Sequence, residues 1–382
     1  MDPTLTDELR SIQETARRFA SERIAPGYMK REALGHVERD LIRDIGELGL
    51  IAPEIPEEYG GYGLPSMASG LIAEAIGYAD PNVAYLQILG SLNAKIVASH
   101  AAPAIAREWL PRLVSGRSVF ALGLTEPRGG SDAANLVLSA RHDGNRYILK
   151  GEKSSISMAD QADALVVFAR TGPVEAKARG VTAFFVPRDT PGITMQRYKD
   201  IGTTAVGRCS IFFDDVVVPE EYRLAEEGMG FVQVMQGFDF SRALIGLQVI
   251  GAAQASLDET WAYINERQAF GAPISVNQGV TFPLAEAETM LAATRQLCYH
   301  TLRLKDAGLP HTSEAAMCKW LGPKTAVDVI HQCLLTHGHY GYSLDLPHQQ
   351  RLRDVMGLEI GDGTAQIMKM IIARQRGASR GR

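Results

Sequence analysis

The sequence changes its pattern twice, and these two changes limit the fold more than any other feature. Up to about residue 115, apolar residues recur at spacings of three and four, the period of one buried helical face. From Ser118 onward, short apolar and β-branched runs are separated by Gly, Asp or Pro, as in strands joined by turns. Helical spacing returns near Gly228 and persists to Arg376. The pattern therefore predicts an α+β chain of helices, then strands, then helices.

At 382 residues, the chain is longer than one hydrophobic core usually supports. We expect an N-terminal α-helical domain (1–116), a middle β domain (117–226) and a C-terminal α-helical domain (227–382). Thr6 is the expected N-cap of the first helix, and the Pro/Gly-rich stretch Ala52–Pro65 is expected to be a loop. The expected strands are Ser118–Leu124, Leu136–Ala140, Arg146–Lys150, Ala164–Ala169, Val181–Val186 and Ser210–Val218.

The charge and composition exclude several classes of protein. A net charge of −5 provides no basic excess to replace the counterions of nucleic acid. No uncharged apolar run reaches the roughly 20 residues that span a bilayer, so we expect no membrane insertion. The cysteines contain no CxxC pair, which predicts reduced thiols in a cytoplasmic protein. They are Cys209, Cys298, Cys318 and Cys333.

Two Gly-rich loops carry the chemistry. Gly123-Leu-Thr-Glu-Pro-Arg-Gly-Gly-Ser-Asp132 ends the first strand-like run in a turn, whose backbone N–H groups can approach a polar ligand closely. Gly361-Asp-Gly-Thr-Ala-Gln366 places Asp362 between two glycines, directly before a helical segment. Asp at such a position is either a general base or the N-cap of the helix.

The first of these loops resembles the signature of the acyl-CoA dehydrogenase family. Further matching stretches follow in the family's order, so the resemblance covers essentially the whole chain. They are Pro56-Glu-Glu-Tyr-Gly-Gly-Tyr-Gly63, Gly151-Glu-Lys-Ser-Ser-Ile-Ser157, Phe238-Asp-Phe-Ser-Arg242, Glu266-Arg-Gln-Ala-Phe-Gly271 and Arg353-Asp354. The resemblance implies two helical domains flanking a β-barrel-like domain, the second a four-helix bundle, in a homotetramer. It also implies FAD as cofactor, an acyl-CoA as substrate and electron-transferring flavoprotein as electron acceptor.

The reaction implied is removal of a proton from Cα and of a hydride from Cβ of the thioester, the hydride passing to flavin N5. The developing enolate oxygen needs pre-placed donors. In the family these are a ribityl hydroxyl of the cofactor and the backbone N–H of the base residue, here Asp362. Most members have Glu at this position. Some place the base on the helix that contains Ser241, but Ser241 carries no carboxylate, and Asp362 is therefore the expected catalytic residue.

The resemblance also assigns ligand contacts by position. Asp239 and Arg242 are three residues apart on one helical face, so an intrahelical ion pair without a ligand remains an alternative for them. For Tyr85 and Leu86, core packing remains an alternative to ligand contact. The cofactor-binding residues it implies are Leu124, Thr125, Gly130, Ser131, Ile156, Ser157, Arg267, Phe270, Gln278, Leu335, Gly338, Thr364 and Gln366, with Arg267, Phe270 and Gln278 acting across a subunit interface. The substrate-binding residues are Ser131, Asp239, Arg242, Gly363, Tyr85 and Leu86.

Aspartate in place of glutamate suggests the type of acyl group. The side chain is shorter by one methylene, which withdraws the carboxylate by about 1.5 Å, whereas reacting atoms must come within about 3–3.5 Å of each other. A cyclic or α-branched acyl group fills this space better than a straight chain. The family includes members acting on cyclohexane-1-carboxyl-CoA that resemble this chain in having aspartate. We therefore expect conversion of cyclohexane-1-carboxyl-CoA to cyclohex-1-ene-1-carboxyl-CoA.

Two positions depart from the family pattern. Ser155 stands where Trp is usual beside the flavin edge, which leaves oxygen open as an electron acceptor. Near the adenosine end, Leu335 replaces the usual Gln and His339 replaces a glycine. His337 and His339 lack companion ligands at metal-binding spacing, so no metal is expected.

Three alternatives keep a related scaffold. An acyl carrier protein thioester can replace the CoA ester. Nitroalkane oxidases also use aspartate as base, but they have arginine seven residues later, where this chain has Lys369. A non-catalytic, flavin-containing DNA-binding protein is disfavoured by the acidic charge and by the presence of Asp362.

Overall fold

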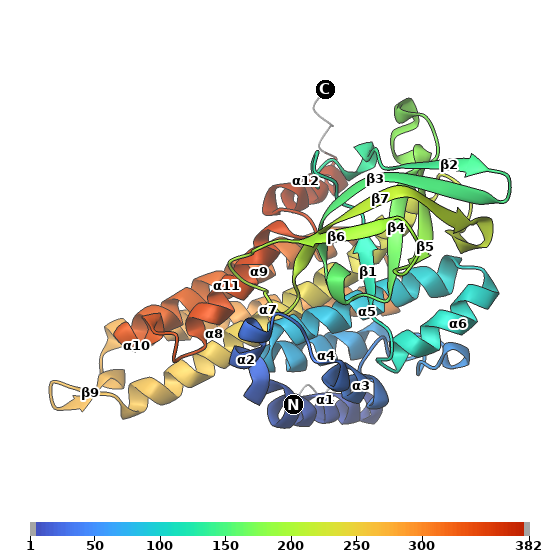
Figure 1. The fold of residues 1–382 in the computed structure, drawn as a ribbon. Helices are drawn as coiled ribbons and strands as arrows, with labels where there is room; N and C mark the ends of the chain where they lie inside the picture. Colours follow the sequence, from blue (N-terminus) through green and yellow to red (C-terminus); the bar gives the residue numbers. More distant parts are fainter. Residues whose placement is uncertain (1–4, 378–382) are drawn as a thin grey trace.

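The computed structural model describes residues 5–377 and confirms the order helices, strands, helices (Figure 1). The ends of the first and last expected domains, residues 1–4 and 378–382, lie outside the described residues. Thr6 caps the first helix as expected, because its hydroxyl accepts a hydrogen bond from the N–H of Leu9 at 3.3 Å. The N-terminal helices are α1 (Asp7–Phe19), α2 (Tyr28–Leu34), α3 (Arg39–Glu47), α4 (Ser66–Ala79), α5 (Pro81–His100) and α6 (Pro103–Val114).

The expected loop between α3 and α4 contains only a short 3-10 turn, Glu57–Tyr59. Its compactness depends on glycine. A Cβ on Gly61 would lie 1.9 Å from the carbonyl oxygen of Ile55, so no other residue fits there without moving the backbone.

The middle part forms one eight-stranded, mostly antiparallel sheet among the described residues. Its order is β6-β7-β3-β2-β4-β5-β8, and β1 pairs in parallel with β4. The strands are β1 (Phe120–Gly123), β2 (Ser139–Asp143), β3 (Arg146–Ser157), β4 (Ala164–Arg170), β5 (Val181–Pro187), β6 (Ile193–Arg197), β7 (Arg208–Pro219) and β8 (Arg223–Leu224).

Four strands differ clearly from the expectation: β3 extends seven residues beyond the expected end at Lys150, β8 was not expected, and β2 and β6 differ as follows. The strand expected over Leu136–Ala140 begins only at Ser139, because the N–H groups of Val137 and Leu138 donate to the carboxylate of Glu126, at 2.7 and 2.8 Å, instead of to a neighbouring strand. Strand β6 was not expected, since only two of its five residues, Ile193 and Met195, are apolar and its side chains are largely exposed.

The C-terminal part consists of long helices that pack around α9. The helices are α7 (Gly230–Glu266), α8 (Gln278–Asp306), α9 (Thr312–Thr336), α10 (His339–Tyr342), α11 (His348–Ile360) and α12 (Ala365–Gln375). A small hairpin of β9 (Gln268–Ala269) and β10 (Ala272–Pro273) separates α7 from α8. It lies at the end of the helical body farthest from the sheet (Figure 1).

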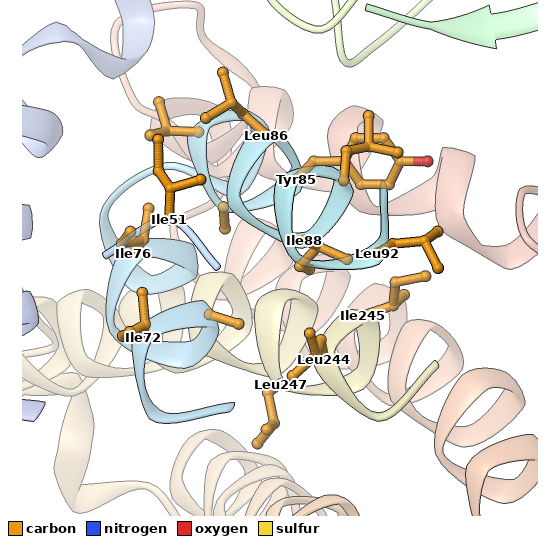
Figure 2. Close-up of a cluster of buried hydrophobic side chains, with 14 of the residues drawn as sticks. Ile51, Ile72, Ile76, Tyr85, Leu86, Ile88, Leu92, Leu244, Ile245 and Leu247 are labelled. Carbon is orange, nitrogen blue, oxygen red and sulfur yellow. The ribbon is translucent and has the colours of Figure 1, made fainter. Parts of the chain in front are cut away.

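The N- and C-terminal helices share one hydrophobic core, which sequence order alone does not reveal. In Figure 2, Ile72 and Ile76 from α4, Ile88 and Leu92 from α5, and Leu244, Ile245 and Leu247 from α7 pack in one cluster. A second core lies within the sheet and includes Tyr147, Phe184 and Phe213. The helices therefore form a single body, and the sheet lies on one side of it (Figure 1).

The matched Arg353-Asp354 pair joins the three parts of the chain. The carboxylate of Asp354 is buried and accepts hydrogen bonds from Tyr28 Oη (2.8 Å), Asn82 Nδ2 (2.9 Å) and the N–H of Thr203 (2.5 Å). Burial raises the pKa of Asp354 to about 6. Arg353 pairs with Glu32. The role of this pair is thus to fix the helices and the sheet relative to each other.

No helix in residues 5–377 is long and apolar enough to cross a membrane. The four cysteines are buried and unpaired. Within the same residues, no cluster of three or more His, Cys, Asp or Glu side chains is arranged to hold a metal ion.

Candidate active site

Asp362 lies in the short loop between α11 and α12, in the left-handed backbone region at φ 55°. Asp tolerates this region better than most residues do. The N-cap of α12 is Thr364, whose hydroxyl accepts a hydrogen bond from the N–H of Ile367 at 3.4 Å. Capping of the helix therefore does not account for Asp362, and its carboxylate is available for another role.

The carboxylate of Asp362 faces α5. Tyr85 donates a hydrogen bond from its hydroxyl to Asp362 Oδ2 at 3.2 Å. Burial and the charge of Asp362 raise the pKa of Tyr85, and a hydrogen bond with Ser157 opposes this rise. The Tyr85 hydroxyl therefore keeps its proton and remains a donor. Three expected site residues, from α5, β3 and the α11–α12 loop, come together here.

Leu86 points elsewhere. It shares one helical face with Gly90, four residues on, and Gly90 closely approaches Ile51. In Figure 2, Leu86 and Tyr85 point to different sides of α5. This position favours core packing for Leu86, and its contact with a ligand stays a prediction.

The loop that follows β1 is held by a buried ion pair. Lys153 Nζ lies 2.9 Å from Glu126 Oε1 and donates to the carbonyl of Leu124 at 3.0 Å, and both charged side chains are at most 4% exposed. Burial lowers the pKa of Lys153 to about 8, and Glu126 opposes this. The N–H of Ser154 donates to the carbonyl of Thr125 at 2.8 Å. These contacts fix the start of the loop, whereas Gly130 and Ser131 remain exposed.

A bulge in β3 lies beside this loop. The pairing of β3 with β7 shifts between Lys153 and Ile156, and Ser155 within the shift has φ 57°. Beyond it, Ile156 is buried and Ser157 reaches Tyr85. Bulges redirect side chains in a sheet, and Ser157, just after this one, contacts the Tyr85 hydroxyl.

On α7, Arg242 is 4% exposed and forms the intrahelical ion pair with Asp239 at 2.9 Å. The hydroxyl of Thr312 donates to the other oxygen of Asp239 at 2.6 Å. Arg242 Nε is buried without a partner among the described residues. Burial lowers the pKa of Arg242, whereas Asp239 and Asp362 raise it. Arg242 thus retains a free donor near Asp362, while Asp239 is already engaged.

The other expected cofactor residues form two groups. Thr364 and Gln366, with Gly363, adjoin Asp362 at the start of α12. The second group lies at the β9–β10 hairpin and the ends of α8 and α9, far from the sheet (Figure 1). It comprises Arg267, Phe270, Gln278, Leu335 and Gly338. Phe270 is fully exposed at φ 52°. A single chain therefore does not bring both groups together.

The two histidines near the end of α9, His337 and His339, lie in different environments. His337 is buried, with its ring 4.2 Å from that of Tyr263 and 4.3 Å from that of His348. His339 is exposed. No shared ligand arrangement follows from this placement.

Three family models match the chain in order. The N-terminal domain of acyl-CoA dehydrogenase matches residues 6–117, its middle domain residues 121–216 and its C-terminal domain residues 228–376. The chain belongs to the acyl-CoA dehydrogenase family. It is accordingly an FAD-dependent oxidoreductase that acts on CH–CH groups of acyl-CoA thioesters.

Curated relatives match over nearly the whole chain. The mitochondrial short-chain specific acyl-CoA dehydrogenase of Mus musculus is 33% identical, over 97% of this chain and 90% of the relative. The benzylmalonyl-CoA dehydrogenase of Aromatoleum aromaticum is 34% identical, over 98% and 99%.

Solved structures of acyl-CoA dehydrogenases have the same fold as this chain. Butyryl-CoA dehydrogenase from Megasphaera elsdenii superposes with a TM-score of 0.94 at 31% identity, covering 98% of this chain and 100% of that one. A glutaryl-CoA dehydrogenase from Mycobacterium smegmatis in complex with FADH2 gives 0.93 at 26% identity, covering 99% and 97%.

The loop after β1 and the end of β3 offer groups that would suit the cofactor. Thr125, Ser131 and Ser157 supply hydroxyl groups, and the exposed turn at Gly129 and Gly130 supplies accessible backbone at the end of a rigidly anchored loop. Gly129 lies at an exposed, open turn, where a Cβ would meet nothing within 4 Å. Such polar, pre-placed groups suit an isoalloxazine ring and a pyrophosphate.

Proposed function

We propose that the enzyme oxidises an alicyclic acyl-CoA, cyclohexane-1-carboxyl-CoA, to its 1-ene, and that Asp362 removes the α-proton. The observation that carries the proposal is the position of Asp362. It is the carboxylate on the loop before α12, is free of a capping role, and receives a hydrogen bond from Tyr85. FAD supplies the acceptor for the hydride that leaves Cβ.

The other residues bind and orient the substrate and the cofactor. The backbone N–H of Asp362 donates to the thioester oxygen as negative charge develops there, which favours enolate formation. Tyr85 donates to Oδ2, and we assign the proton transfer to the other oxygen, Oδ1. Arg242, with its free Nε, and Gly363 contact the thioester side of the substrate. Leu124, Thr125, Gly130, Ser131, Ile156, Ser157, Thr364 and Gln366 contact the cofactor.

The short side chain of Asp362 favours a substrate that is bulky at Cα. Aspartate ends about 1.5 Å short of glutamate, and a ring at Cα brings the acidic hydrogen toward that wall. The relative from Aromatoleum aromaticum is named for benzylmalonyl-CoA, a ring-bearing acyl group, although the Mus musculus relative is named for short chains. The relatives therefore permit the alicyclic substrate, and the length of the base favours it.

The substrate is tested by anaerobic stopped-flow mixing of the FAD-loaded enzyme with cyclohexane-1-carboxyl-CoA or octanoyl-CoA. We expect the flavin's visible absorbance to bleach at least about tenfold faster with the cyclic ester, since a 1 Å misplacement can cost about 100-fold. Faster bleaching by the linear ester would refute the alicyclic assignment but leave the reaction class intact.

Replacing Tyr85 with Phe tests the orientation of the base. The change removes one hydrogen bond to a carboxylate and keeps the ring, so we expect the rate of flavin reduction to fall about tenfold, consistent with about 1.5 kcal/mol for a charged hydrogen bond. Flavin content and thermal stability should not change. An unaltered reduction rate would show that the hydroxyl does not orient Asp362.

We also propose a homotetramer that passes electrons to electron-transferring flavoprotein. The separation of Arg267, Phe270, Gln278, Leu335 and Gly338 from the Asp362 loop supports an arrangement in which a second subunit completes each cofactor site (Figure 1). Four buried, unpaired cysteines suit a reducing compartment such as the cytoplasm.

A further inference from the structure

Lys319, on α9, is buried beside the loop that carries Asp362. It is only 1% exposed, which is rare for lysine. Nothing in the motifs of the sequence distinguishes it. Its neighbours along the helix, Cys318 and Trp320, give no indication of chemistry.

Its ammonium group spans the loop. Lys319 Nζ donates to the carbonyl of Leu358 at 2.5 Å and to the carbonyl of Gly363 at 3.2 Å. Leu358 lies in the last turn of α11, where carbonyl groups lack partners within the helix. Gly363 directly follows Asp362. Lys319 therefore holds the chain on both sides of Asp362.

The loop needs such support. Asp362 and Gly363 both have positive φ, 55° and 106°. A Cβ on Gly363 would lie 2.4 Å from Cε of Met368, so the turn is also tightly packed against α12. Backbone of this kind persists only when surrounding contacts determine it. The lysine provides two of these contacts and Tyr85 provides a third, on the carboxylate itself.

The charges around Lys319 come from three elements. Asp362 from the loop and Glu359 from α11 favour its protonated form, whereas burial and Arg242 from α7 disfavour it. Together they lower the pKa of Lys319 to about 8. At neutral pH the group is therefore mainly an ammonium ion, with three N–H donors for the two carbonyls.

We propose that Lys319 is a positioning residue for the reaction: by holding the carbonyls of Leu358 and Gly363, it fixes both the carboxylate and the backbone N–H of Asp362 against the acyl thioester. This role rests on the proposed function of Asp362 as base. Lys319 touches neither the substrate nor the cofactor. Its effect is on the alignment of Asp362, and hence on kcat more than on KM.

The test compares Lys319→Met with Lys324→Met, a lysine on the same helix that is paired with Asp328 at the surface. Hydrogen exchange measured by mass spectrometry should show faster exchange over residues 361–368 in Lys319→Met alone. With the acyl-CoA that reduces the wild-type flavin, kcat should fall about 100-fold and KM should change less than about threefold. Flavin content should match the wild type.

Lys319→Gln, which keeps an N–H donor without the charge, should lose less activity than Lys319→Met. The proposal would be overturned by a folded variant whose kcat is within about twofold of wild type and whose exchange over residues 361–368 is unaltered. Failure of both variants to fold would also overturn it, because Lys319 would then have a purely structural role. If none of the acyl-CoA thioesters reduces the flavin of the wild-type enzyme, the proposed function fails. The comparison of hydrogen exchange still decides whether Lys319 holds the loop.

Discussion

Asp362→Asn is expected to lower the rate of flavin reduction by an acyl-CoA about 10²–10⁴-fold, the usual contribution of a general base. Asparagine has nearly the same shape and also tolerates φ 55°, so the loop and the contact with Tyr85 can persist. The measurement is anaerobic stopped-flow reduction at saturating thioester, with flavin content and melting temperature recorded for each protein.

Asp362→Glu is the matched control, because it keeps the carboxylate and extends it by about 1.5 Å. We expect it to retain activity and to shift preference from cyclohexane-1-carboxyl-CoA toward octanoyl-CoA. A rate for Asp362→Asn within about tenfold of wild type would place the base elsewhere in the chain.

Asp80→Ala is expected to destabilise the protein by about 3–5 kcal/mol, because it removes one partner of a buried ion pair and leaves Arg31 with only the partly exposed carboxylate of Glu38 as a counterion. Asp80 is fully buried and lies 2.8 Å from Arg31, which is itself 2% exposed. Asp80 also caps α5 through the N–H of Asn82 at 2.8 Å. Burial raises the pKa of Asp80 and Arg31 opposes this, so the carboxylate depends on its partner to stay charged.

The measurement is a shift of the urea unfolding midpoint of the FAD-loaded protein. Asp40→Ala is the control, since Asp40 forms an exposed pair with Arg43, and exposed pairs contribute little. Because α5 also carries Tyr85, we expect Asp80→Ala to slow flavin reduction as well. Equal midpoints for Asp80→Ala and Asp40→Ala would show that the buried pair does not stabilise α5.

The sequence predicted the parts of the fold that depend on local patterns. Helix α1 with its Thr6 cap, the loop before α4 and most strands follow from spacing and turn residues. Strand β2 starts later than predicted because the carboxylate of Glu126 takes the N–H groups of Val137 and Leu138. Glu126 is close in sequence to both of these residues. Its ion-pair partner Lys153, however, lies on β3, and only the folded sheet brings Glu126 and Lys153 together.

For the site, the motifs located Asp362 and the flavin loop, but not the groups that hold them. Tyr85 was predicted as a pocket residue, and the structure adds its hydrogen bond to Asp362. Lys319 was not predicted, since an isolated lysine in a helical pattern normally faces solvent. Its role depends on the packing of α9 against α11 and α12, which spacing along the chain does not specify.

The role of Asp362 is tested most directly by mixing the wild-type enzyme or Asp362→Asn anaerobically with cyclohexane-1-carboxyl-CoA. Flavin absorbance follows the reduction, and mass spectrometry identifies the thioester product. We expect the wild-type flavin to bleach while the thioester loses one hydrogen from Cα and one from Cβ, and we expect Asp362→Asn to show neither change on the same timescale. Equal bleaching and equal two-hydrogen loss in both proteins would contradict this role.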